Sequence, residues 1–259
     1  MPWPTELYLE HVVTFALVGV RISAVVIVAP VFGPFEVPLR VRALMALALV
    51  VLIVPLEVGR ATAPPDTLVA FLVAAGGEAL VGLVLGLGVR ILFSAMQLAG
   101  QLISQVSGFQ LADVFSPGAN ANVPLFSQLL LCVTTAVFFC IGGHRRVIEA
   151  LLDTFVWLPA GQGGFSHSAL AAATALVAHS FVLGVRAAAP AVVALLLATL
   201  IVGLVSRTLP QLNVLALGFG TGALVAVAAI GISLGGVCWI FADQLEPVLE
   251  TALDALRPH

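Results

Sequence analysis

Charge is what this sequence has least of. Only 9% of its 259 residues are charged, and none of them is a lysine. Soluble domains carry about 25% charged residues, and together with a mean hydropathy of +1.17 the shortage excludes an ordinary soluble domain. The ten arginines form no group larger than the pairs Arg40/Arg42 and Arg145/Arg146, and the formal net charge is -3. Nucleic-acid binding needs clustered positive charge, so no nucleic-acid partner is expected.

Reactive groups are equally scarce. The three cysteines lie inside apolar segments, where we expect small buried core residues, and no Cys/His grouping has the spacing of metal ligands. Neither a glycine-rich phosphate loop nor a serine-nucleophile elbow is present. The acidic residues in or beside apolar segments do not pair with a histidine or with one another: Glu78, Asp113, Glu149 and Asp153. The sequence predicts no catalytic residue, no cofactor and no metal, hence no enzyme.

What the sequence has in abundance is apolar runs. About 20 such residues span a bilayer as a helix, so we predict an all-α integral membrane protein with about six apolar helical segments. They are 12–32, 43–56, 67–89, 125–141, 168–205 and 214–241. The second is short for a full span, and Pro190 makes the fifth either two helices or one kinked helix. No basic region precedes the first segment, which predicts that it is retained and not cleaved as a signal peptide.

We predict one domain over residues 1–259, in four parts. Residues 1–107 hold the N-terminal helices, 108–124 a central loop, 125–241 the C-terminal helices and 242–259 a tail. The tail places its apolar residues on one helical face, typical of an interfacial or partner-binding helix. That face comprises Leu245, Val248, Leu249, Ala252, Leu253 and Leu256.

Two further patterns concern helix contacts. Gly82 and Gly86 form a Gly-x-x-x-Gly pair, which permits close approach of a neighbouring helix. Four arginines lie within or beside apolar segments: Arg21, Arg90, Arg186 and Arg207. Each either extends to the membrane interface or bonds carbonyls or acids of partner chains in a wet, protein-lined interior, because leaving it unpaired in lipid is costly.

A polar seam runs along the helix that precedes the central loop. Its members recur at spacings of three and four, the rhythm of one helix face: Ser94, Gln97, Gln101, Ser104 and Gly108, with Gln105 beside them. Hydrocarbon would leave the glutamine amides unsatisfied. They therefore bond other helices of this chain, line a water-filled lumen, or contact another subunit.

The central loop, 108–124, is rich in turn residues and lies between strongly apolar segments. Its free backbone groups need water or protein and cannot face lipid. It is either a surface loop or a plug within a channel.

A series of motifs follows in order along the chain. They begin with Arg21 and Ala29-Pro30-Val31-Phe32, and continue with Val37-Pro38-x-Arg40-Val41-Arg42, Gln97-Leu-Ala-Gly-Gln101 and Gly108-Phe-x-x-Ala112-x-x-Phe115-x-Pro117. The most specific is Gly143-His144-x-x-x-Ile148-x-x-Leu151-x-Asp153-Thr154-Phe155-x-x-Leu158-Pro159-x-Gly161, and Pro210-Gln-Leu-Asn213 with Gly218-Phe219 closes the series. Taken together, this ordered series resembles the FliR family of type III export proteins and their injectisome counterparts.

The resemblance implies a channel subunit of the flagellar export gate. Such a subunit assembles with FliP-like and FliQ-like subunits, contacts an FlhB-like export protein and passes unfolded flagellar export substrates. Its place would be the bacterial inner membrane, in the flagellar basal body, with the gate partly on the periplasmic side. Overall likeness favours flagellar over injectisome service. The alternative is a secondary transporter for a small solute, which also uses kinked helices and polar seams.

The same resemblance implies that the central loop is the plug of the closed gate. The plug residues would be Gly108, Phe109, Gln110, Asp113, Phe115, Pro117 and Gly118. One departure bears on it: the family often has Phe-Asp-Pro where this chain has Phe115-Ser116-Pro117, which removes a charge from the plug.

Overall fold

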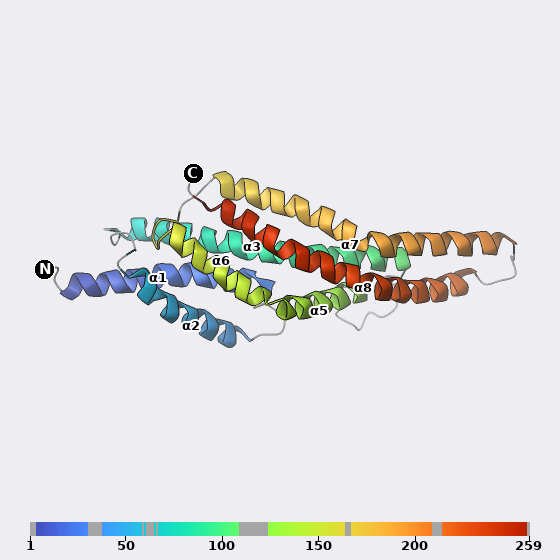
Figure 1. Ribbon diagram of the computed structural model, residues 1–259, viewed down its shortest axis with the longest axis horizontal. Helices are drawn as coiled ribbons and strands as arrows, with labels where there is room; N and C mark the ends of the chain where they lie inside the picture. Colours follow the sequence, from blue (N-terminus) through green and yellow to red (C-terminus); the bar gives the residue numbers. More distant parts are fainter. Residues whose placement is uncertain are drawn as a thin grey trace. The chain divides into compact units, whose positions relative to one another are not determined.

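The computed structural model describes residues 4–30, 38–58, 60, 65, 67–108, 124–163, 167–208 and 214–257, and the regular secondary structure in these ranges is helical. The helices, labelled in Figure 1, are α1 (Pro4–Val28), α2 (Leu39–Glu57), α3 (Leu68–Ser107), α5 (Leu125–Cys140), α6 (Gly143–Trp157), α7 (His167–Thr208) and α8 (Val214–Asp254). The all-α prediction is confirmed.

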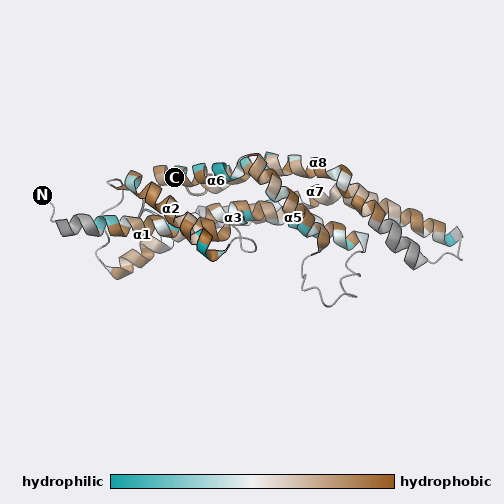
Figure 2. Ribbon diagram, turned by 90° about the horizontal axis from the view of Figure 1, so that it is seen from below, coloured by the Kyte–Doolittle hydropathy of each residue, from teal (hydrophilic) through white to brown (hydrophobic). Residues whose placement is uncertain are grey.

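The helices have the length and composition of membrane spans. Within the described ranges, five are long and apolar enough to cross a bilayer, or up to six if α5 and α6 together form one broken span. Figure 2 shows that hydrophobic residues dominate the helices along their length, with few hydrophilic ones between them. The predicted integral membrane protein is confirmed in this respect, and the 19-residue α2 is long enough to span, contrary to the expectation that it is short.

Three helices are longer than predicted. The 40 residues of α3 join the segment 67–89 to the seam, and the 41 residues of α8 join 214–241 to the tail. Hydropathy marks apolar stretches, but a helix continues through glutamine, alanine and leucine because all three are good helix formers. The 42 residues of α7 continue through Pro190 without a break. Of the two possibilities that the sequence leaves open, the structure therefore shows one helix.

Packing divides the chain into two compact units. The first comprises Met1–Ile91, Gly142–Val177 and Leu245–His259, and the second comprises Leu92–Ile141 and Ala178–Gln244. Because α3, α7 and α8 each contribute residues to both, the units are not successive domains along the chain.

In the first unit, α1 packs on α2 and on α3. A Cβ atom at Gly82 would overlap the backbone oxygen of Arg21, and one at Gly86 would lie 3.0 Å from the Cβ of Val28. Both glycines therefore lie where α1 approaches α3 most closely, and the helix contact predicted from the Gly-x-x-x-Gly pair is confirmed.

The C-terminal part of α8 and the turn that follows it belong to the same unit. Their apolar face is buried as a set: Leu245, Val248, Leu249, Ala252, Leu253 and Leu256. Val248 and Ala252 flank Gly88 of α3, where an added Cβ would lie 3.5 Å from each side chain. The amphipathic pattern was predicted correctly, but its interpretation as an interfacial or partner-binding helix is wrong, because the chain covers this face itself.

The second unit has an aromatic core. The ring centroid of Phe93 lies 5.6 Å from that of Phe138 and 5.1 Å from that of Phe241, distances typical of favourable edge and tilted ring pairs. Gly100 of α3 meets α5 here, and Gly184 of α7 approaches the backbone oxygen of Ala95. The core thus joins α3, α5, α7 and α8.

The cysteines were predicted to be buried, and this is wrong. Cys132 and Cys140 are exposed and Cys238 is half-buried. The error has a physical cause: in this chain apolar helix faces point outward as well as inward, so an apolar neighbourhood in sequence does not imply burial in the fold.

Gly100 gives a test of the contact between α3 and α5. A Cβ there would lie 2.5 Å from the Cα and 2.6 Å from the backbone nitrogen of Ser127. We expect Gly100→Ala to lower the free energy of unfolding by about 1–3 kcal/mol, the usual cost of overpacking. The measurement is denaturant titration of the detergent-solubilised protein.

The matched control is Gly231→Ala in α8, because nothing lies within 4 Å of its added Cβ. Alanine there should be neutral or stabilise by about 0.5–1 kcal/mol through helix propensity. Equal stability of the two variants would contradict the close packing at Gly100.

Candidate functional site

Two opposite charges meet inside the first unit. Arg21 of α1 donates from Nε to Oε2 of Glu78 in α3 at 2.5 Å, and neither side chain has any exposed surface. A charge removed from water is tolerated when it is paired and hydrogen-bonded. Each residue of the pair can therefore stay charged in this buried position only because the other is present.

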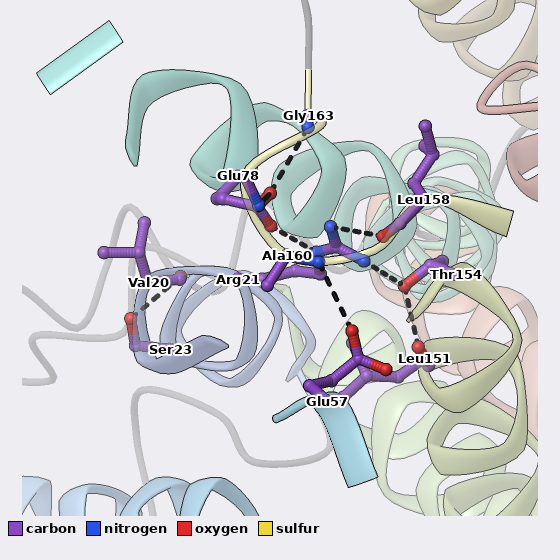
Figure 3. A network of polar contacts seen from close by, with 11 residues as sticks. Val20, Arg21, Ser23, Glu57, Glu78, Leu151, Thr154, Leu158, Ala160 and Gly163 are labelled. Carbon is purple, nitrogen blue, oxygen red and sulfur yellow. Dashed lines mark hydrogen bonds and ion pairs between the residues drawn. The ribbon is translucent and has the colours of Figure 1, made fainter. Parts of the chain in front are cut away.

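The rest of the guanidinium is also satisfied (Figure 3). Its Nη1 donates to Oγ1 of Thr154 in α6 at 3.2 Å, and its Nη2 donates to the backbone oxygen of Leu158 at 2.9 Å. Its Cζ lies 4.1 Å from the ring centroid of Phe155, within the range of a cation–π contact. Arg21 thus holds α3, α6 and the turn after α6 against α1.

Glu78 binds the same turn from the other side. Its Oε1 accepts from the backbone N–H of Gly161 at 2.9 Å and of Gly163 at 3.3 Å. The turn has the residues for this approach: Gly161 has a φ of 94°, a region that favours glycine. A Cβ at Gly163 would lie 2.7 Å from the backbone carbon of Gly77.

A second carboxylate reaches the turn from α2. Glu57, the last residue of that helix, is 2% exposed, and its Oε2 accepts from the backbone N–H of Ala160 at 3.3 Å. Side chains of α1, α2 and α3 therefore converge on residues 158–163, and Thr154 of α6 joins them through Arg21. We call this cluster the turn network; its members are Arg21, Glu57, Glu78, Thr154, Leu158, Ala160, Gly161 and Gly163.

Sequence reasoning missed this network. From the sequence, Arg21 either extends to the membrane interface or bonds carbonyls or acids of partner chains, whereas the structure pairs it with an acid of the same chain. A signal was available: Arg21 and Glu78 are opposite charges inside apolar segments, and the cost of an unpaired charge there favours pairing them. The turn itself could not be found, since it binds through backbone N–H groups that any sequence has.

The other three arginines of the apolar segments are not buried. Arg90, Arg186 and Arg207 are exposed, so for them the choice between an interface position and a protein-lined interior stays open. The cluster of charges that could hold a metal is also lacking: within the described ranges no group of three or more His, Cys, Asp or Glu side chains gathers.

The polar seam lies within an arc of about 100° on α3, and that arc runs from the exposed side of the helix to the buried side. Ser94, Gln101 and Gln105 are exposed, Gln97 is half-buried and Ser104 is 1% exposed. At about 100° per residue, the three exposed residues fall within about 40° of one another. Gln97 and Ser104 lie about 60° and 80° from Ser94, on the side that turns toward the core.

The glutamine amides have no partner within the described part of the chain. By contrast, the backbone oxygen of Gln97 accepts from Oγ of Ser127 at 3.0 Å, which fastens α5 to α3 beside the seam. This bond uses the backbone of Gln97, whereas the prediction concerns the glutamine amides, so a lumen or subunit contact of those amides stays a prediction. The side chains of Gln101 and Gln105 point out of the chain. We call the exposed Gln101 and Gln105, with the half-buried Gln97, the amide row.

The predicted plug falls almost wholly outside the described residues. Gly108 is described and has a φ of 76°, a left-handed conformation that ends α3 in the manner of a glycine helix cap. The remaining predicted plug residues lie outside the described ranges: Phe109, Gln110, Asp113, Phe115, Pro117 and Gly118. The plug role stays a prediction.

Comparison with known proteins decides the family. The model of the bacterial export proteins, family 1, matches residues 12–248. The chain belongs to this family. Its match extends from α1, through both compact units, into the C-terminal part of α8.

Two FliR relatives match over most of the chain, and a secretion-system relative matches over about half of it. Flagellar biosynthetic protein FliR of Caulobacter vibrioides is 26% identical, with 91% of this chain and 94% of that protein covered. FliR of Aquifex aeolicus is 30% identical, with 87% and 86% covered. Secretion system apparatus protein SsaT of Salmonella typhimurium is 28% identical, over 53% of this chain and 54% of its own length.

The resemblance to FliR predicted from ordered motifs is thus confirmed, and this family member is a membrane protein of bacterial export. The fold shows that residues of two of those motifs contact one another. Arg21 comes from the first, whereas Thr154, Leu158 and Gly161 come from the most specific one, and all four meet in the turn network.

Removing one charge from the ion pair should be more harmful than removing both. We expect Arg21→Leu to lower the free energy of unfolding by about 3–5 kcal/mol, because it leaves the Glu78 carboxylate buried without a cation. Arg21→Leu combined with Glu78→Gln should recover part of that loss, since glutamine still accepts from Gly161 and Gly163 and carries no charge. Denaturant titration in detergent measures all three proteins.

Arg145→Ala is the control, since the pair of Arg145 with Glu149 is exposed and such pairs contribute about 0.5 kcal/mol or less. A double variant less stable than Arg21→Leu would show that an unpaired charge is not what makes the single variant costly.

Proposed function

We propose that this chain is a structural channel subunit of the bacterial flagellar type III protein export gate. It assembles with FliP-like and FliQ-like subunits, contacts an FlhB-like export protein and passes unfolded export substrates across the inner membrane. It acts by shape and packing and performs no catalysis. The gate lies in the flagellar basal body, partly on the periplasmic side.

One observation carries the proposal: family membership over residues 12–248, with relatives named flagellar biosynthetic protein FliR that match over 94% and 86% of their own length. SsaT, named for a secretion system apparatus, matches about half of its own length. The longer and more numerous FliR matches favour flagellar service over an injectisome.

The surface of the described chain supports assembly with other membrane helices. Exposed large hydrophobic side chains extend along α2, where they include Leu44, Leu47 and Leu52, and along α7, where they include Phe181 and Leu197. Only three residues of α2 are buried. Contiguous apolar surface of this extent marks contact with lipid or with other proteins.

The plug and the amide row provide the parts that a conduit needs. We place residues 108–124 in the closed conduit as its plug, because their backbone groups must be shielded from lipid. We place the amide row on the conduit wall, because exposed amides on an apolar helix need water or other polar groups as hydrogen-bond partners.

Transport of a small solute is the weaker reading. It requires a binding site with ionisable residues inside the membrane. Within the described part of the chain, the buried opposite charges Arg21 and Glu78 bind each other and the chain's own turn, which leaves neither for a solute.

Assembly and export test the proposal directly. Expressed in a flagellated bacterium that lacks its own FliR, together with the FliP-like and FliQ-like chains of its source, this chain should co-purify with both and restore secretion of flagellar proteins. Purification as a stable monomer or homodimer, free of both chains, would contradict the proposal.

Deleting the plug should open the closed gate. Removal of Gly108–Asn122 from the assembled complex is expected to raise the passage of ions or small molecules, measured as conductance in planar bilayers. The control is deletion of Ala61–Pro64, a segment of the connection between α2 and α3. Conductance equal to that of the intact complex would count against the plug role.

A further inference from the structure

The amide row raises a question that the proposed function leaves open, namely which chemical group it contacts. We propose that it binds the backbone of an extended polypeptide, through the side-chain amides of Gln97, Gln101 and Gln105. This inference rests on the proposed function and names the part of the exported protein that the wall recognises.

The first step concerns what the amides require. Gln101 and Gln105 are exposed, Gln97 is half-buried, and none of the three amides bonds a residue within the described ranges. Each amide has two N–H donors and one carbonyl acceptor, and hydrocarbon would leave them unsatisfied at a cost of several kcal/mol. A lipid tail is therefore the wrong neighbour for this stretch of α3.

The second step concerns spacing. Glutamines four residues apart on a helix are separated by about 6.0 Å along its axis, at 1.5 Å per residue. An extended chain rises 3.2–3.4 Å per residue, so one of its edges presents an N–H and a C=O about every 6.6 Å. Over the two intervals from Gln97 to Gln105 the mismatch along the axis is about 1.2 Å, which flexible glutamine side chains can absorb. The row also turns by about 80° around the helix over these eight residues, so a strand that follows it crosses α3 obliquely.

The third step concerns geometry at each amide. On that edge of an extended strand, the N–H and C=O of the same residue point the same way. A glutamine amide can accept from that N–H and donate to that C=O at once. A neighbouring helix offers no such groups, because its backbone N–H and C=O bond within the helix.

The consequence is that the amide row would recognise an extended polypeptide whatever its amino-acid sequence. Side chains of an extended strand stand roughly perpendicular to the hydrogen-bonding direction, so the amides contact what every polypeptide shares. The row is also neutral at Gln97, Gln101 and Gln105, so it neither attracts nor repels acidic or basic segments strongly. Such a surface suits a wall along which many different chains slide.

Site-specific crosslinking tests this contact in the assembled complex. A benzoyl-phenylalanine is placed at residue 101 or 105, and two flagellar export substrates of unrelated sequence are each halted in transit by a fused folded domain. Both substrates should crosslink from both positions. The control is residue 196 on α7, where the exposed Leu196 lies on an apolar face and should give no substrate adduct.

Adducts with another gate subunit or with lipid, in place of substrate, would overturn the inference, and so would adducts with only one of the two substrates. The proposed function is judged separately, by the wild-type chain: if it does not restore secretion, the export role fails. If it restores secretion while residues 101 and 105 crosslink only to other subunits, the inference alone fails.

A substitution series separates the amide from the shape of the side chain. Gln101→Met and Gln105→Met keep length and lose the amide, and each should slow export about two- to tenfold, the worth of one hydrogen bond, with unchanged yield of the complex. Gln101→Asn and Gln105→Asn keep the amide and should retain more of the rate. Export at the wild-type rate in the Met variants, or a loss confined to complex yield, would contradict the contact.

Discussion

The ion pair between Arg21 and Glu78 has no exposed atom, and the first compact unit is arranged so that both charges are satisfied. The guanidinium uses Nε, Nη1 and Nη2 on α3, α6 and the turn after α6, while the carboxylate uses its second oxygen on backbone N–H groups of that same turn. A buried pair of this kind adds little net stability over apolar residues of similar volume. Its effect is on specificity: any other register of α1 against α3 would bury two unpaired charges.

Much of the fold could be predicted from the sequence. The composition indicated an all-α membrane protein, Gly82 and Gly86 indicated a close helix contact, and the tail showed its apolar face. These features are local, so a short window of sequence contains the whole signal. The long helices were divided wrongly because polar residues such as Gln97 and Gln101 interrupt hydropathy without interrupting the helix.

The turn network could not be predicted in full, since its partners are separated by 57 to 137 positions. The sequence shows that Arg21 needs an acidic partner, but it does not show that this partner is Glu78. Nothing in the sequence marks the backbone N–H of Gly161 as a second group that Glu78 binds. The prediction that the tail is an interfacial or partner-binding helix was wrong for a related reason. An amphipathic pattern predicts that one face is covered, and whether the cover is lipid, a partner or the chain itself depends on packing across the fold.

Helix length has a consequence for how this protein occupies a membrane. The three longest helices have 40, 42 and 41 residues, so each would measure about 60 Å if straight, twice the roughly 30 Å of a hydrocarbon core. Unless strongly tilted, each places about half of its residues beyond the acyl chains, where water would meet exposed leucine and valine. That half needs a protein cover, so a chain of this kind inserted alone would leave apolar side chains in contact with water, and its stability in the membrane would depend on assembly with other proteins.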